Sequence, residues 1–192
     1  LIYKGSEIMV VEADEFDRSF LHLSPTIACV TSMDADHLDI YGSISELENT
    51  FVDFSKLVPD SNNLLFKTGL PLEGKTVSAT ENADFEARNV RIVKGSYVFD
   101  LKTPSEEIKD LRFHLPGRHN MFNAVTALGM AILVGAPIDS LPNALQDFKG
   151  VKRRFSYKIK TKNLVLIDDY AHHPAEIDAI HQAVTEMYPQ NK

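Results

Sequence analysis

Residues 25–31, Pro-Thr-Ile-Ala-Cys-Val-Thr, decide the fold class. The apolar run Ile27-Ala-Cys-Val30 would bury side chains on both faces of a strand, which is typical of a parallel sheet covered by helices. Residues 43–57 then carry apolar side chains at helical spacing, and Pro59 ends that stretch. A buried strand followed by an amphipathic helix indicates an α/β fold with a mainly parallel sheet flanked by helices.

The same alternation continues along the chain. Short β-rich runs separated by turn residues fill residues 60–115, with a hairpin signal at Lys94-Gly95, and predict a small antiparallel meander. The other predicted elements are two buried strands and three helices, at residues 7–12, 164–167, 118–134, 140–148 and from Pro174 onward.

Lys149-Gly150 is the predicted domain boundary. Residues 1–150 would form one α/β domain, and residues 151–192 would supply the first strand and helix of a second domain, which the family resemblance described below implies is Rossmann-like. The chain begins with Leu1 and enters a β-like run at once, so we expect it to be a piece of a longer protein.

Composition narrows the function classes. The net charge is −7 and the pI is about 5.5, which argues against nucleic-acid binding because phosphates need clustered Lys and Arg. No apolar run is long enough to span a membrane, and no signal peptide is visible. Cys29 is the single cysteine and lies in an apolar run, so a buried structural thiol in a reducing, cytoplasmic compartment is expected.

Polar side chains follow three of the predicted strands, in the stretches 12–15, 34–37 and 168–173. In open α/β sheets, ligands bind beyond the carboxyl ends of the strands. If the strands are neighbours, carboxylates and imidazoles converge on one cleft that suits Mg²⁺ and phosphate oxygens. Helix capping or solvation is the simpler alternative for any single acidic residue there. Adjacent residues diverge, so His172 and His173 are not expected to bind one ion together.

Gly69-Leu-Pro-Leu-Glu-Gly74-Lys75-Thr76 matches the phosphate-loop pattern in full. A working phosphate loop needs a helix after it, so that backbone N–H groups and the helix dipole hold the phosphates. The β-branched residues and turn signals that follow argue against such a helix. We therefore predict an ordinary loop here.

Several long motifs resemble the Mur ligase family. Val11-Glu-Ala-Asp-Glu-Phe-Asp17 and Asp34-Ala-Asp-His-Leu-Asp-Ile-Tyr-Gly42 are similar to its central domain. Leu115-Pro-Gly-Arg-His-Asn-Met-Phe-Asn-Ala124 resembles its G-x-H-N-x-x-N-A signature. The third domain of the family opens with stretches similar to residues 151–155 and 168–174. These motifs occur in the family's order over nearly the whole chain.

The resemblance implies a role for individual residues. Glu12 and His37 match ligands of Mg²⁺ beside the ATP phosphates, and Asn120 and Asn123 match asparagines that contact adenine, although Asn120 could also be a helix N-cap. The remaining matches are a phosphate-contacting arginine, a nucleotide-contacting aspartate and a residue near the incoming amino acid, at Arg154, Asp169 and His172.

The family's phosphate loop and its UDP-sugar domain would precede Leu1, so the resemblance implies that these 192 residues alone are inactive. Many relatives also carry a carbamylated lysine on the helix after the Asp-His motif. Only Lys56 is available there, near the helix end, which leaves a second metal site open.

The branch that resembles the chain most adds L-alanine to UDP-N-acetylmuramate with ATP and Mg²⁺, through an acyl phosphate, in peptidoglycan synthesis. Three alternatives stay open. A tripeptide-adding ligase of cell-wall recycling shares the Glu12 and Asp168 motifs, a metal-dependent phosphohydrolase could use the Asp and His clusters, and a non-catalytic module could bind ATP only. Nothing in the sequence indicates the oligomeric state.

Overall fold

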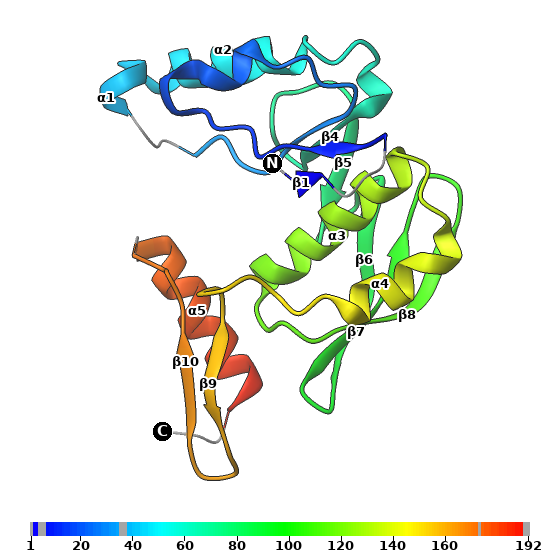
Figure 1. Cartoon of the computed structure of the whole chain (residues 1–192), viewed down its shortest axis with the longest axis vertical. Helices are drawn as coiled ribbons and strands as arrows, with labels where there is room; N and C mark the ends of the chain where they lie inside the picture. Colours follow the sequence, from blue (N-terminus) through cyan, green and yellow to red (C-terminus); the bar gives the residue numbers. More distant parts are fainter. Residues whose placement is uncertain (1, 4–6, 35–37, 173, 190–192) are drawn as a thin grey trace. The chain divides into compact units, whose positions relative to one another are not determined.

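The computed structural model describes residues 2–3, 7–34, 38–172 and 174–189 (Figure 1). The chain forms two compact units, unit 1 (Leu1–Lys75) and unit 2 (Thr76–Lys192). The two compact units meet at residue 75 and do not coincide with the predicted domains, so the boundary at residue 150 stays a prediction.

Unit 1 is built on a parallel strand pair. β3 (Ala28–Val30) pairs in parallel with β4 (Leu64–Lys67), and Cys29 lies opposite Leu65. The other elements are β1 (Ile2–Tyr3), β2 (Met9–Val10), the 3₁₀ segments η1 (Phe16–His22) and η2 (Ser61–Asn63), and the helices α1 (Leu38–Tyr41) and α2 (Ile44–Ser55). The parallel pairing confirms what the apolar run at 27–30 predicts.

Helix α2 forms for the reasons visible in its sequence. The Ser43 side chain caps its first turn by accepting a hydrogen bond from the N–H of Glu46 at 3.2 Å. Leu47 and Phe54 of the predicted stripe are buried. The Phe54 ring stacks on Phe20 of η1, with ring centroids 4.8 Å apart, so the helix and the 3₁₀ segment share one core.

The prediction of a buried strand at residues 7–12 is wrong. Only Met9 and Val10 are extended, and β2 pairs antiparallel with the two-residue β1. Their side chains are 63% and 58% exposed. An apolar run shows that side chains can be buried, and it does not show which element covers them.

Unit 2 combines one parallel pair with a meander. β5 (Lys75–Ser78) runs parallel to β6 (Phe85–Val93), and β6, β7 (Ser96–Lys102) and β8 (Glu107–Phe113) follow one another antiparallel. Lys94 and Gly95 both have positive φ, so the predicted hairpin turn is confirmed. The predicted meander is too long, because its first two strands belong to parallel pairs: β4 pairs with β3, and β5 pairs with β6.

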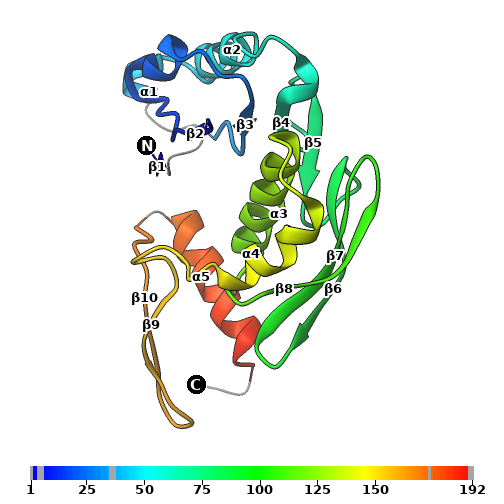
Figure 2. The ribbon, with the colours of Figure 1, turned by 45° about the vertical axis from the view of Figure 1, so that its right-hand side comes forward.

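Two helices cover the meander. α3 (Arg118–Leu133) packs against β6. α4 (Leu141–Asp147) follows a short 3₁₀ turn, η3 (Ile138–Ser140), and packs against β8. Figure 2 shows both helices on the same side of the β6–β8 strands. Val125 of α3 is fully buried in this layer, as its helical spacing predicts.

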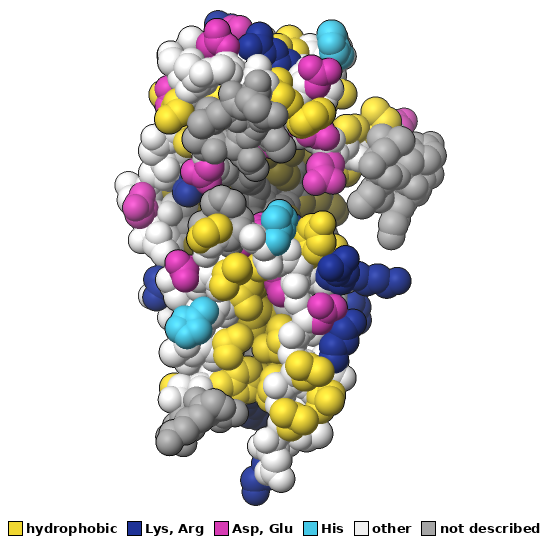
Figure 3. Space-filling model, turned by 90° about the vertical axis from the view of Figure 1, so that its left-hand side faces the viewer, with side chains coloured by type: hydrophobic (Ala, Val, Ile, Leu, Met, Phe, Trp, Pro, Cys, Tyr) yellow, Lys and Arg dark blue, Asp and Glu magenta, His cyan; other side chains and the backbone are white. Residues whose placement is uncertain are grey.

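The last residues form a hairpin and a helix. β9 (Ser156–Lys160) pairs antiparallel with β10 (Val165–Asp168), and α5 (Pro174–Met187) begins at the predicted proline. The prediction that residues 164–167 form a buried strand is wrong, since Leu164 and Leu166 are 56% and 50% exposed. Figure 3 shows hydrophobic side chains gathered in the lower half of the view, on the face that lies to the left in Figure 1.

The predicted α/β class is confirmed, with parallel strand pairs, flanking helices and a small antiparallel meander. Burial raises the pKa of the Cys29 thiol to about 12, as expected of a structural thiol. Within the described ranges, no helix is both long and apolar enough to cross a membrane.

Candidate functional site

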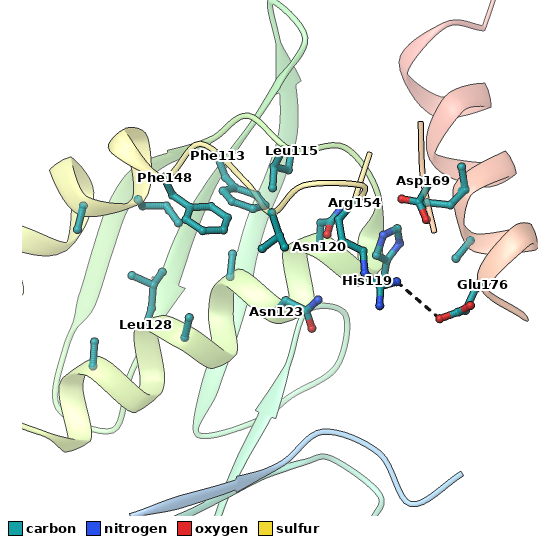
Figure 4. Close-up of a pocket in the computed structure, with 18 of the residues that line it drawn as sticks. Phe113, Leu115, His119, Asn120, Asn123, Leu128, Phe148, Arg154, Asp169 and Glu176 are labelled. Atoms are coloured by element: carbon teal, nitrogen blue, oxygen red, sulfur yellow. Dashed lines mark ion pairs between the residues drawn. The ribbon is translucent and has the colours of Figure 1, made fainter. Parts of the chain in front are cut away.

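Unit 2 contains a pocket of about 830 Å³, a volume that suits a cofactor-sized ligand (Figure 4). Its walls come from α3, α4, α5 and the segments on either side of the β9–β10 hairpin. The pocket brings together side chains that are more than fifty residues apart in the sequence.

One end of the pocket is apolar. Figure 4 shows Phe113, Phe148 and Leu128 grouped there, away from the charged residues. Small side chains of α3, among them Ala124 and Ala127, line the wall beside them. This end can take a flat apolar group, while the other end offers the polar contacts that fix its orientation.

The start of α3 supplies amide side chains. The helix N-cap is Gly117, whose φ of 100° is open to glycine and strained for other residues, so the reading of Asn120 as an N-cap is wrong. Asn120 instead lies in the first turn and donates from Nδ2 to the carbonyl of Pro116 at 2.6 Å. Its Oδ1 can accept a hydrogen bond from a ligand.

Asn123 lies three residues further along α3, on the same side of the helix as Asn120. Its side chain is exposed and lines the same pocket. The two predicted adenine-contacting residues are therefore brought together.

Asp169 follows β10 and organises the loops around the pocket. Its Oδ2 accepts from the N–H of Phe155 at 2.7 Å, and its Oδ1 accepts from the N–H of Ala171 at 2.8 Å. The carboxylate thus ties the segment before β9 to the segment after β10. It also lines the pocket, so each oxygen can offer its second lone pair to a ligand.

Arg154 lies at the polar end of the pocket. Its Nη1 is 3.6 Å from Oε1 of Glu176 in the first turn of α5, the ion pair that is dashed in Figure 4. The two side chains are 53% and 37% exposed, so water screens the pair. An anionic ligand can compete with Glu176 for the guanidinium at little cost.

His119 is a pocket residue that the sequence reasoning passed over, although it stands inside the quoted Gly-x-His-Asn motif. Burial lowers the pKa of its ring below the ordinary 6.5; Asp169 acts against this shift and Arg154 with it. The imidazole is neutral at pH 7 and can donate from one nitrogen and accept at the other. Glu176 was also missed, because a glutamate early in a helix resembles a favourable helix-dipole residue.

His172 does not line the pocket, although it contacts Glu176, which does. It is exposed, and its Nδ1 lies 3.0 Å from the carbonyl oxygen of Tyr170. Its backbone N–H donates to Oε2 of Glu176 at 3.1 Å. It is not among the described residues that line the pocket, so its predicted place near the incoming amino acid stays a prediction.

The two predicted Mg²⁺ ligands belong to unit 1. Glu12 is exposed in the loop after β2, where a carboxylate can take a cation, and His37 lies outside the described residues. Across residues 2–3, 7–34, 38–172 and 174–189, no group of three or more His, Cys, Asp or Glu side chains is placed to hold a metal. The pair, and the predicted cleft that joins it to Asp168 and Asp169, stay predictions.

The phosphate-loop match at residues 69–76 is an ordinary loop, as predicted. Lys75 begins a strand, not a helix, and its Nζ donates to the carbonyl of Asn62 at 2.6 Å. Thr76 is also engaged, since its N–H and its Oγ1 both donate to Oδ2 of Asp84 at 2.8 Å. The lysine and the threonine that would serve phosphate and cation are held by the fold itself.

Comparison with known proteins identifies relatives over the whole chain. A family model described as the Mur ligase middle domain matches residues 1–131. A UDP-N-acetylmuramate–L-alanine ligase from Christiangramia forsetii is 64% identical over 192 residues, and one from Flavobacterium psychrophilum is 58% identical. Each alignment covers the whole of this chain. The chain spans 42% and 43% of the length of these relatives.

Solved structures share the fold. A UDP-N-acetylmuramate-alanine ligase, MurC, from Thermotoga maritima aligns with a TM-score of 0.79 over 94% of this chain and 43% of its own, at 24% identity. MurF from Acinetobacter baumannii aligns with a TM-score of 0.74 over 91% of this chain and 40% of its own, at 19% identity. At these identities the likeness supports the fold alone.

Proposed function

This chain belongs to the Mur ligase middle domain family, and on that basis we propose that the intact protein joins L-alanine to UDP-N-acetylmuramate with ATP. The relatives that support this substrate choice are named as UDP-N-acetylmuramate–L-alanine ligases and match the chain from end to end. The product is a precursor of peptidoglycan. We place the reaction in the cytoplasm, where ATP and nucleotide-linked sugars are made.

One observation carries the nucleotide part of the proposal. The four residues matched to nucleotide contacts line a single pocket of about 830 Å³, namely Asn120, Asn123, Arg154 and Asp169. They come from two predicted domains and three separate segments. Such a convergence is what a nucleotide site requires, and the division at residue 150 stays a prediction.

The two ends of the pocket suit the two ends of ATP. Adenine is flat and largely apolar, and its amino group is a donor for which Oδ1 of Asn120 offers an acceptor. Arg154 lies at the charged end, where its planar, permanently charged fork matches phosphate oxygens. When phosphate arrives, it replaces or shares the contact of Arg154 with Glu176.

Glu12 and His37 are proposed to hold Mg²⁺. The exposed Glu12 carboxylate has the chemistry for this, since Mg²⁺ prefers oxygen ligands. When bound, the ion supplies charge neutralisation for the phosphates. His172, near the start of α5, is proposed to approach the incoming amino acid.

The reaction has two steps. A carboxylate oxygen of the muramic acid attacks the γ-phosphorus of ATP, the bond to the β-phosphate oxygen breaks, and ADP leaves. The L-alanine nitrogen then attacks the acyl phosphate carbonyl, phosphate leaves with the bonding electrons, and the amine loses a proton. Catalysis of this kind depends on positioning and charge neutralisation. Arg154 would supply positive charge in the first step.

Phosphate release by the intact protein tests this function. ATP, Mg²⁺ and UDP-N-acetylmuramate are supplied with L-alanine, with a tripeptide, or with neither. Release that depends on L-alanine supports the proposal. Release that depends on the tripeptide would assign the recycling ligase in its place, and release from simple phosphate esters without an acceptor would assign a phosphohydrolase.

A further inference from the structure

Tyr97 makes two hydrogen bonds that the nucleotide site does not explain. It belongs to β7 and is 2% exposed. Its hydroxyl accepts from the N–H of Gly117 at 3.1 Å and donates to Oε2 of Glu186 at 2.6 Å. One side chain in the sheet therefore holds both the N-cap of α3 and the last turn of α5.

A second contact lies beside the first. A Cβ built on Gly117 would lie 3.1 Å from the Cβ of Ala183 and 2.6 Å from the His119 ring. Ala183 is 1% exposed and stands three residues before Glu186, hence on the same face of α5. α5 thus rests directly on the start of α3, and the two hydrogen bonds of Tyr97 lie beside that contact.

These two helices form different walls of the pocket. The start of α3 contributes Asn120 and Asn123, and the first half of α5 contributes Glu176 and Ile180. Glu176 and Glu186 are ten residues apart, about 15 Å along a helix. α5 is therefore held at one end by Arg154 and at the other by the tyrosine.

The tyrosine hydroxyl is suited to a permanent connection. Burial, with Glu186 acting in the same direction, raises the pKa of Tyr97 to about 12. The hydroxyl keeps its proton throughout the physiological range and always has a donor for the carboxylate.

We propose that Tyr97 is a positioning residue that holds α5 against the start of α3 and thereby sets the width of the nucleotide pocket. The inference rests on the proposed function, because it takes ATP as the occupant. Tyr97 touches neither the pocket nor the reacting atoms, so its loss weakens nucleotide binding and leaves the chemical step intact.

Steady-state kinetics of the intact protein test this role. Tyr97→Phe keeps the ring and removes both hydrogen bonds, and we expect KM for ATP to rise about threefold to tenfold while kcat stays within about twofold. Glu186→Leu is expected to act alike, and Glu186→Gln, which keeps an acceptor, to stay near the wild type. Tyr188→Phe is the matched control, because it removes a hydroxyl bonded to Tyr157 outside the pocket.

An unchanged KM in both Tyr97→Phe and Glu186→Leu would overturn the inference, and so would a fall in kcat with KM unchanged. If Tyr97→Phe does not fold, the exposed Glu186 still allows the Leu and Gln comparison. A wild type without ATP-dependent turnover would refute the proposed function. The anchoring is then measured by hydrogen exchange at the Gly117 amide, which must be faster in Tyr97→Phe and Glu186→Leu than in the wild type and in Tyr188→Phe.

Discussion

Asp169 connects two loops of unit 2 through hydrogen bonds within the protein. Its two oxygens accept from the N–H groups of Phe155 and Ala171. In Asp169→Asn one of these oxygens becomes an amide donor that faces an N–H. We expect the free energy of unfolding to fall by about 1–3 kcal/mol, measured by urea denaturation.

Asp168→Asn is the control for that change. Asp168 is paired with Lys158 at 3.3 Å, and both side chains are more than a third exposed. Surface ion pairs contribute little, so a loss below about 1 kcal/mol is expected. Equal losses in the two variants would contradict the role of Asp169 as a connector of loops.

His119 makes the stability of unit 2 depend on pH. The pKa of the His119 ring is lowered in the folded state, so below pH 6.5 the unfolded chain binds the proton more readily. The free energy of unfolding therefore decreases as the pH is lowered. Above 6.5 both states are neutral and the effect vanishes. We expect His119→Asn to lose less stability than the wild type between about pH 7 and 5. His114, whose pKa burial also lowers, is present in both proteins, so the difference isolates His119.

Parallel urea denaturations of the two proteins at several pH values check this expectation. Curves with the same pH dependence would show that the His119 ring titrates alike in the folded and unfolded chains.

Among the elements, α2 depends on its cap. The Ser43 side chain satisfies the N–H of Glu46, and removing it leaves that donor to water. Ser43→Ala should destabilise the protein by about 0.5–2 kcal/mol in thermal or urea unfolding. Ser43→Asp keeps an acceptor at the same place and should restore most of the loss; an aspartate variant as unstable as the alanine one would refute the capping account.

The loop at residues 69–76 matches the phosphate-loop pattern, and its part in ATP binding can be tested by substitution. Because Lys75 donates to the carbonyl of Asn62 and begins a strand, we expect it to have no part in the nucleotide site. We expect Lys75→Met to leave ATP affinity within about twofold of the wild type, measured by calorimetry on the intact protein. Arg154→Met, the comparison variant, should weaken it about tenfold. A large loss at Lys75 would mean that the loop binds phosphate after all.

Helices were predicted better than strands, for a physical reason. The starts of α2, α3 and α5 follow from caps, breakers and a 3.6-residue apolar period that are local in sequence. Whether β4 pairs in parallel with β3, or whether β10 is covered, depends on residues far along the chain. The sequence pattern of an apolar strand is the same in each case.

The site shows the same limit. Family motifs in the sequence indicated Asn120, Asn123, Arg154 and Asp169, and all four line the pocket. Tyr97 could not be found this way, since one aromatic residue in a β-rich run reads as core. Its two hydrogen-bond partners are 20 and 89 residues away.

At the scale of the whole molecule, the proposed nucleotide site lies within unit 2, between segments of the predicted middle and C-terminal domains. The relatives span more than twice the length of this chain. We therefore expect other parts of the intact protein to supply the phosphate loop and the binding site for the sugar substrate. Of the proposed reaction, these residues contribute the binding of the nucleotide.

Photolabelling of the intact protein with 8-azido-ATP, followed by peptide mapping, shows directly whether ATP occupies the pocket of unit 2. We expect labels within residues 113–128 or 141–154, which contain residues that line the pocket, and we expect excess ATP to prevent this labelling. ATP-protected labelling confined to residues 69–76, or elsewhere away from the pocket, would contradict it.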